Sequence, residues 1–165
     1  MQLSRLLRHL ILPHWWVLRA FPASSLAMIE RAISGSENSH QAELRFVVEA
    51  SLPLSDLLPD RSPRARALEL FSQLRVWDTE HNSGVLIYLQ LIDRRVEIIA
   101  DRGIDTKVGH KFWRTVCHHM EQAFREGRFE TGALDALTEI TEVLAEHFPP
   151  AGVNPNELPD APLVL

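Results

Sequence analysis

The alternation of apolar and polar positions predicts three β-strands in the middle of the chain. Residues 85–91 form a run that is almost wholly apolar, rich in β-formers and too short for a typical helix, which indicates a buried strand. The charged residues 93–95 can turn the chain, and residues 96–100 then return antiparallel with alternate apolar positions. Residues 42–49 also alternate, and their polar positions predict a strand with only one face under a helix.

The helical spacing of other apolar residues predicts helices before, between and after these strands. They are expected over residues 23–37, from Pro63 onward, over 110–125 and over 130–147. The helix that starts at Pro63 connects strand 42–49 to strand 85–91, and such a crossover makes the two strands parallel with a right-handed connection. The pattern therefore predicts a single α/β domain with a small mixed β-sheet flanked by helices.

Length and composition are those of one ordinary soluble globular domain. The chain has 165 residues, of which 45% are hydrophobic and 24% charged. A formal net charge of -5 argues against a general nucleic-acid binder, because the neutralisation of phosphates needs a basic face. The single cysteine, Cys117, excludes an intrachain disulfide and suits a reducing compartment, so cytoplasmic residence is the default expectation. Nothing in the composition indicates the oligomeric state.

The two ends of the chain differ in composition from the predicted domain between them. We expect an N-terminal arm over residues 1–22, the domain over 23–149 and a proline-rich tail over 150–165. The apolar stretch of the arm is interrupted and far too short for a stable membrane span. We predict that Trp15, Trp16 and Leu18 pack on the domain, and contact with a membrane surface is the alternative. In the tail, Leu158 and residues 163–165 are expected to anchor on the body.

The hairpin brings polar residues together at one edge of the predicted sheet. Strand 85–91 starts and strand 96–100 ends at this edge, and the parallel strand 42–49 starts beside them. The residues expected to converge there are Glu43, Asp78, Glu80, Asn82, Asp101 and Asp105. Carboxylates at one edge repel one another unless a cation compensates them. Because hard oxygen ligands without cysteine favour Ca²⁺ or Mg²⁺, the sequence predicts a divalent-cation site.

The same residues also allow a purely structural interpretation. Asp78 can cap a turn, residues 82–84 can form a turn, and Asp101 can pair with a neighbouring arginine. An EF-hand is excluded, because Gly84 comes one place late and Leu89 stands where the final glutamate ligand is required. The sequence pattern alone leaves both interpretations open.

Cys117 and the histidines beside it are weaker candidates for chemistry. Cys117 lies on the apolar face of the predicted helix 110–125, and Ala123 stands where a Cys-x₅-Arg phosphate cradle needs its arginine. A buried core thiol is therefore the better interpretation. His118 and His119 are adjacent on a helix and point about 100° apart, which prevents them from chelating one metal together.

The order and spacing of five short segments resembles the TPM domain family. This family is named from a thylakoid-lumen protein, a photosystem II repair protein and a modulator of the levamisole receptor. The segments are the Glu43-bearing run at 40–45, Asn-Ser-Gly-Val-Leu at 82–86, Ala-Asp-Arg-Gly-Ile-Asp at 100–105, Phe-Pro at 148–149 and Asn-Glu-Leu-Pro-Asp at 156–160. The resemblance covers residues 23–160 and is greatest to the stand-alone bacterial branch. Ser83 is inserted where many members have Asn-Gly directly, and Ala42 replaces a glycine before Glu43.

The resemblance implies a helix-flanked α/β fold with an acidic cleft at the sheet edge that binds Ca²⁺-like cations. Plant members are described as acid phosphatases, whereas bacterial members mostly lack an established activity. The chain departs from the secreted, membrane-anchored members, because it shows no convincing signal peptide and no C-terminal transmembrane helix. A role in the repair of membrane complexes is therefore not expected.

Two functions are consistent with these observations. In the first, the chain is a binding or accessory module whose acidic edge holds a Ca²⁺-like cation or meets a protein partner. In the second, the cation polarises a phosphoryl oxygen and Arg102 or Arg45 neutralises the phosphate, which makes the chain a metal-assisted phosphatase. Asp101 and Arg102 are the candidate catalytic residues. No dedicated nucleophile stands out in the sequence, so enzymatic activity is left open.

Overall fold

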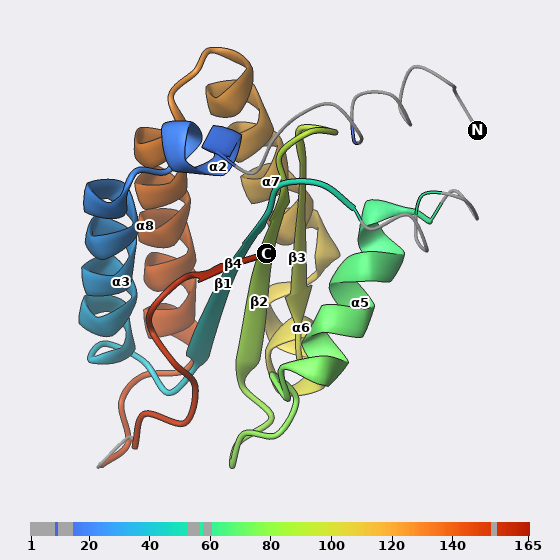
Figure 1. The fold of residues 1–165 in the computed structure, drawn as a ribbon. Coiled ribbons are helices and arrows are strands. Elements are labelled where there is room, and N and C mark those ends of the chain that lie inside the picture. Colours follow the sequence, from blue (N-terminus) through green and yellow to red (C-terminus); the bar gives the residue numbers. More distant parts are fainter. Residues whose placement is uncertain (1–8, 10–14, 53–56, 58–60, 153–154) are drawn as a thin grey trace.

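A computed structural model describes residue 9, residues 15–52, residue 57 and residues 61–152 and 155–165 (Figure 1). The helices of these residues are α2 (Trp15–Ala20), α3 (Ala23–Glu37), α5 (Pro63–Gln73), α6 (Arg102–Val108), α7 (His110–Arg125) and α8 (Phe129–His147). The strands are β1 (Glu43–Glu49), β2 (Gly84–Gln90), β3 (Arg95–Ala100) and β4 (Leu163–Val164). Every strand and helix predicted from the apolar spacing is present. The helix α6 lies where a polar loop was expected.

The described residues form a four-stranded mixed sheet with the order β3-β2-β1-β4. Strand β1 is parallel to β2, with Glu43 opposite Gly84, and β2 is antiparallel to β3, with Val85 opposite Ala100. Both predicted strand relations are therefore confirmed. The short strand β4 adds to the other side of β1 in parallel orientation, so β1 is an interior strand.

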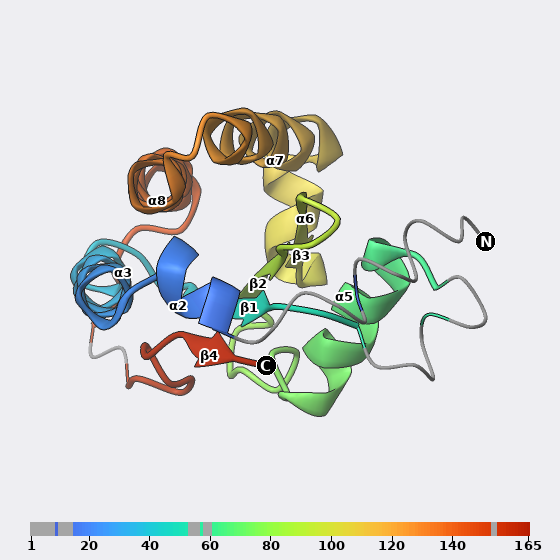
Figure 2. The ribbon, with the colours of Figure 1, turned by 45° about the horizontal axis from the view of Figure 1, so that its top comes forward.

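Helices cover both faces of this sheet (Figures 1 and 2). Helices α3, α7 and α8 lie over one face and bury its apolar side chains, among them Phe46, Ile87 and Ile98, in the larger core. Helix α5 lies over the other face, where Val47, Leu86 and Leu158 belong to a second apolar cluster. Non-polar area removed from water on both faces supplies the main stabilisation of such a three-layered fold.

Local signals fix the ends of several helices. The hydroxyl oxygen of Ser62 accepts a hydrogen bond from Ala65 N at 3.1 Å, and Pro63 is the first residue of α5, as the sequence indicated. Gly109 and Gly127 have φ angles of 81° and 79°, which side chains disfavour, and they stand before α7 and after it. The sequence therefore specifies where these helices begin and end.

The prediction that only one face of β1 lies under a helix is wrong. Every residue of β1 is buried, including Glu43, Arg45 and Glu49. The second face is covered by α5 and by the C-terminal tail, whose Leu158 is buried, as predicted for an anchor. Polar side chains of a strand indicate a wet face only where no other part of the chain supplies hydrogen bonds to them.

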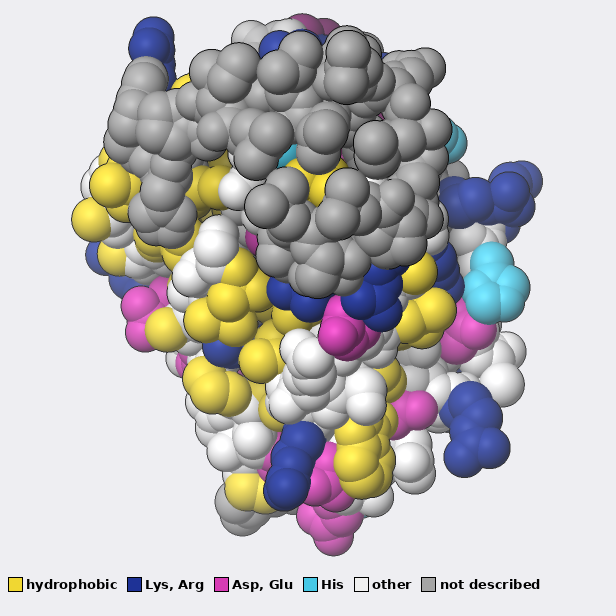
Figure 3. Space-filling view, turned by 45° about the vertical axis from the view of Figure 1, so that its right-hand side comes forward, with side chains coloured by type: hydrophobic (Ala, Val, Ile, Leu, Met, Phe, Trp, Pro, Cys, Tyr) yellow, Lys and Arg dark blue, Asp and Glu magenta, His cyan; other side chains and the backbone are white. Residues whose placement is uncertain are grey.

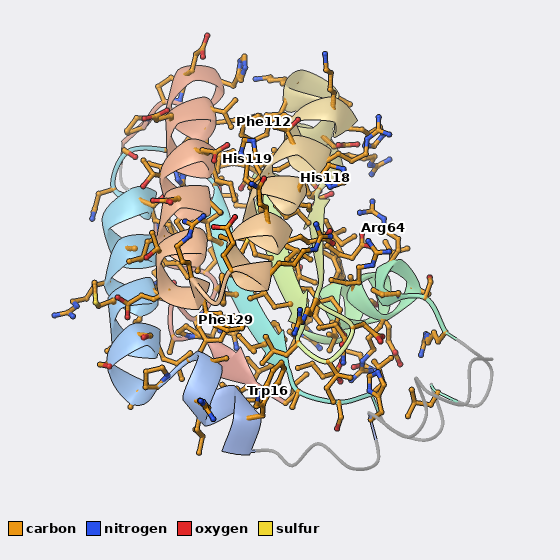
Figure 4. All side chains as sticks on the ribbon, turned by 90° about the horizontal axis from the view of Figure 1, so that it is seen from above. Trp16, Arg64, Phe112, His118, His119 and Phe129 are labelled. Atoms are coloured by element: carbon orange, nitrogen blue, oxygen red, sulfur yellow. The ribbon has the colours of Figure 1, made fainter. Side chains whose placement is uncertain are left out.

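Helix α2 carries part of the arm onto the domain. Val17 is fully buried, and the ring of Trp16 meets that of Phe129 edge to face with 6.5 Å between their centres (Figure 4). The packing of Trp16 is as predicted, but Leu18 is 56% exposed, so its predicted burial is wrong. The helix turns Leu18 away from the face that Val17 buries, and the side chain of Trp15 lies outside the described residues.

No helix among residues 15–52, 61–152 and 155–165 is long and apolar enough to cross a membrane. The surface is mixed in charge. Figure 3, which brings the right-hand side of Figure 1 forward, shows basic and acidic side chains interspersed with apolar ones.

Candidate functional site

The predicted acidic edge is the lower end of the sheet in Figure 1, where β1 and β2 begin and β3 ends. Glu43 is opposite Gly84, and Asp101 N donates a hydrogen bond to Gly84 O at 2.9 Å. Directly opposed residues of a sheet project their side chains to the same face. Glu43 and Asp101 therefore flank Gly84 on the face that α5 and the tail cover.

Close packing explains why position 84 is a glycine, which the sequence motif alone does not show. A Cβ atom on this residue would lie 1.9 Å from the carbonyl oxygen of Val76. The main chain of Val76 thus lies directly over Gly84, between the two flanking carboxylates, and no larger residue fits at position 84. The close approach brings a carbonyl oxygen to the strand that separates Glu43 from Asp101.

Glu43 is completely buried, with an exposed fraction of 0%. Its Oε2 accepts hydrogen bonds from the main-chain N–H groups of Glu157 and Leu158, both at 3.0 Å. Its Oε1 has no hydrogen-bond partner among the described residues. A buried carboxylate with one unpartnered oxygen is costly, and it indicates a missing water, proton or cation.

Three further carboxylates surround Glu43, and we call the four the acidic cluster. Its members are Glu37 at the end of α3, Glu43 at the start of β1, and Glu157 and Asp160 in the tail. Burial raises the pKa of Glu37 to about 8, and the charges of Glu43 and Asp160 add to this although the N–H of Leu44 opposes it. The carboxyl of Glu37 therefore holds its proton at a pH where an exposed glutamate has lost it.

Burial also raises the pKa of Glu43. The hydrogen bonds from Leu158 and Glu157 oppose this shift, whereas the charges of Glu157 and Asp160 reinforce it. Desolvation and the neighbouring negative charges thus both disfavour the ionisation of Glu43. Both causes act in the direction that a bound cation would reverse.

The guanidinium of Arg45, which is buried near the cluster, points away from its carboxylates. Arg45 Nη1 donates to the carbonyl oxygens of Pro159 and Ala161, at 2.7 and 2.6 Å. Burial lowers the pKa of Arg45, and no ion pair between Arg45 and the acidic cluster is present among the described residues. Arg45 therefore fixes the path of the tail and leaves the cluster without a direct counter-charge.

The other predicted ligands take separate positions. Asp78, Glu80 and Asn82 are exposed in the loop before β2, and the carboxylate of Glu157 accepts from Glu80 N at 3.1 and 3.2 Å. Asp105 lies 3.2 Å from the imidazole of His110. Of the predicted set, the structure brings only Glu43 and Asp101 onto the covered face of neighbouring strands.

One carboxylate oxygen of Asp101 caps a helix, and the other has no hydrogen-bond partner among the described residues. Its Oδ1 accepts from Arg102 N at 2.6 Å and so caps α6, while Oδ2 is buried without a partner among the described residues. Arg102, the second catalytic candidate, is exposed at the first residue of α6. The structural interpretation expected Asp101 to pair with a neighbouring arginine, and the contact that the structure shows is with the main-chain N–H of Arg102.

No group of three or more His, Cys, Asp or Glu side chains in the described part of the chain is arranged to hold a metal ion. The cation site and the phosphatase activity therefore stay predictions. Cys117 offers no alternative nucleophile, because burial raises the pKa of its thiol to about 12, with the charge of Glu97 adding to the effect.

Sequence reasoning missed Glu37, Glu157 and Asp160. They stand in a helix end and in the tail, more than a hundred residues apart, and no local pattern connects them. The available signal is the run at 156–160, which the family resemblance marks as the end of the domain.

Comparisons with known proteins were made for the whole chain. The family model described as the TPM domain matches residues 19–143, which is most of the chain. A search of curated proteins finds no match. The family match covers α3, all three central strands and most of α8, and hence the framework of the acidic edge.

Two solved structures have a similar fold. The NMR structure of the BA42 protein from the psychrophilic bacterium Bizionia argentinensis is 27% identical, with a TM-score of 0.75, over 88% of this chain and 95% of that one. The solution NMR structure of the N-terminal domain of a protein from P. gingivalis is 18% identical, with a TM-score of 0.65, over 87% and 96%. The second likeness concerns the fold alone.

Proposed function

Because the chain belongs to the TPM domain family, we propose that it is a binding module that holds a divalent cation of the Ca²⁺ type at its acidic cluster. One observation carries the proposal. Glu43 is fully buried, one of its carboxylate oxygens has no partner among the described residues, and Glu37, Glu157 and Asp160 surround it without a direct counter-charge.

The electrostatics of the cluster favour an exchange of protons for a cation. An uncompensated buried carboxylate costs several kcal/mol, so the carboxyls of Glu37 and Glu43 retain protons at a raised pKa. A divalent cation supplies the missing positive charge and displaces these protons. Cation binding should therefore release protons and strengthen as the pH rises.

The donor set suits Ca²⁺ better than Mg²⁺. Glu43 would contribute Oε1, and Asp160 and Glu37 are the other candidate ligands, together with main-chain carbonyl oxygens and water. Ca²⁺ accepts such irregular sets of six to eight oxygens, whereas Mg²⁺ requires near-ideal octahedral geometry. Because Glu157, Leu158 and Asp160 belong to the tail, the cation would also hold the tail on β1.

Thermal unfolding with and without millimolar Ca²⁺ at about pH 8 tests this function. A cation at a hundred times its dissociation constant adds about 2.7 kcal/mol, which for a chain of this size raises Tm by about 5–10 °C. Mg²⁺ should raise it less. Calorimetric titration in two buffers of different ionisation enthalpy should show proton release.

Matched variants assign the ligands. Glu43→Gln and Asp160→Asn should each abolish the rise in Tm with Ca²⁺. Asp78→Asn, which changes an exposed carboxylate of the nearby loop, should retain this rise. Asp160→Asn keeps the test informative if Glu43→Gln does not fold. A wild-type Tm indifferent to Ca²⁺, or a response lost equally in Asp78→Asn, would overturn the proposal.

A further inference from the structure

A separate cavity opens at the free edge of β3. Its volume is about 390 Å³, which lies in the range of small-molecule sites. It lies between α5, which contributes Arg64, and one face of α7. The face of α7 presents residues three or four places apart, namely His110, Trp113, Arg114, Cys117, His118 and Glu121. This spacing makes a continuous wall along the helix.

The main chain of β3 at this edge already has side-chain partners. Arg64 Nη1 donates to Ile98 O at 2.9 Å, and Val96 N donates to Glu121 Oε1 at 3.3 Å. A peptide that added a strand to β3 would have to break these bonds. The occupant that fits the cavity without such a loss is therefore a small molecule.

The charges of the wall favour an anion. Each of the three carboxylates that line it has a basic side chain beside it: Glu97 lies 3.4 Å from the guanidinium of Arg64 and Glu121 lies 3.6 Å from that of Arg95, while Asp105 lies 3.2 Å from the imidazole of His110, which is charged only when protonated. These pairings leave Arg114 and His118, one turn apart on α7, without an ion-pair partner among the described residues. Figure 4 labels His118 on α7 and Arg64 on α5, and both residues line the cavity.

The floor of the cavity is apolar, and one hydrogen-bond donor in it has no acceptor among the described residues. Val96, Ile98, Ala100 and the Cys117 thiol line it, and Trp113 is only 4% exposed. The Nε1–H of Trp113 is buried and has no acceptor among the described residues. Buried indole N–H groups usually have a partner. We infer that this cavity binds a small organic oxyanion with a planar apolar body, whose charged group meets Arg114 and His118 and whose body lies on Trp113 and β3.

Binding is measured by heteronuclear NMR titration of the full chain in EDTA, which keeps it independent of any cation at the acidic cluster. The probes are benzoate and phenylphosphonate, which distinguish a carboxylate from a phosphoryl ligand. Their counterparts are benzyl alcohol, which lacks the charge, and inorganic phosphate, which lacks the ring. The readout is the indole N–H signal of Trp113, identified with Trp113→Phe. At least one aromatic anion should shift it, saturably, with an affinity several times that for either counterpart.

Arg114→Gln should weaken binding by about tenfold, because it removes a charge-assisted hydrogen bond. Lys111→Gln, the same charge change on an exposed residue of α7 outside the cavity, should leave the affinity unchanged. The spectrum of each variant shows directly that it is folded. No shift of the Trp113 signal with either aromatic anion, equal binding of inorganic phosphate, or equal losses in the two variants would overturn the inference.

Discussion

Two glutamates stand at opposite ends of β1, Glu43 at its first residue and Glu49 at its last, and they are 0% and 2% exposed. At the upper end, Arg66 Nη2 donates to Glu49 Oε1 at 2.8 Å, its Nε lies 3.2 and 3.3 Å from the two carboxylate oxygens, and Tyr88 OH donates to Oε2 at 2.5 Å. At the lower end, Glu43 accepts hydrogen bonds from two main-chain N–H groups of the described residues and lies near further carboxylates.

The two glutamates share residue type, strand and burial, so the difference lies in what packs over each end. Helix α5 brings a guanidinium to Glu49, whereas the tail brings Glu157 and Asp160 to Glu43. A buried ion pair with complete hydrogen bonding is a structural element of the fold. A buried carboxylate left without a cation is a feature that a fold retains for binding.

Removal of Arg66 should leave Glu49 as uncompensated as Glu43, and we expect this change to have the largest effect on stability. Arg66→Met keeps an unbranched apolar side chain but leaves Glu49 without its counter-charge, which should lower the free energy of unfolding by about 3–5 kcal/mol near pH 7. Urea denaturation near pH 7 measures the loss.

The double variant Glu49→Gln/Arg66→Met is the control, since it removes the uncompensated charge and should recover part of the stability. A loss below about 1 kcal/mol in Arg66→Met would mean that the pair is not what distinguishes the two ends.

Glu37→Gln should reduce the repulsion between carboxylates at the lower end of β1. The pKa of Glu37 is about 8 in the folded protein and near 4.5 when exposed, so the folded state binds more protons between these values. Wild-type stability should therefore fall as the pH rises from about 4.5 to 8, and the variant should lose this slope. At about pH 8 we expect it to be more stable by about 2 kcal/mol after allowance for solvent screening.

Tm measured across this pH range in the absence of divalent cations tests the prediction. Glu30→Gln, an exposed glutamate of the same helix, should follow the wild-type curve. Parallel curves for wild type and Glu37→Gln would show that burial of Glu37 does not affect stability.

The smallest expected effect concerns the phenol at the upper end. Tyr88→Phe removes one hydrogen bond to Glu49 but leaves Arg66 in place, so the free energy of unfolding should fall by about 1.5 kcal/mol. Equilibrium denaturation measures the loss. A loss as large as that of Arg66→Met would mean that the hydroxyl of Tyr88, and not the guanidinium of Arg66, is what stabilises the buried Glu49.

The sequence predicted the central fold well because its signals are local. The apolar run of β2, the alternation of β3 and the helical stripes of α7 and α8 each indicate an element within one segment. The short crossover then implies that β1 and β2 are parallel, and the turn after β2 implies the antiparallel β3. From these relations alone, Glu43 and Asp101 could be placed at one end of the sheet.

Local patterns could not show what the tail does. Leu163 and Val164 form β4 beside β1, Leu158 enters the second apolar cluster, and Glu157 and Asp160 approach Glu43. The sequence alone therefore misplaced β1 as half exposed. It predicted ligands in the hairpin loops, where Asp78, Glu80 and Asn82 are exposed, and that ligand set stays a prediction. These contacts join positions more than a hundred residues apart.

By itself, then, the amino-acid sequence determined the order of helices and strands, the parallel pair at the centre and the presence of carboxylates at its lower end. Only the tertiary structure decided which carboxylates meet and that a cavity lies along β3. It also decided that, among the described residues, Glu49 has a counter-ion and Glu43 has none. The physical reason is that periodicity reports which face of a segment is apolar, whereas the charge around a buried group depends on which distant segment packs against it.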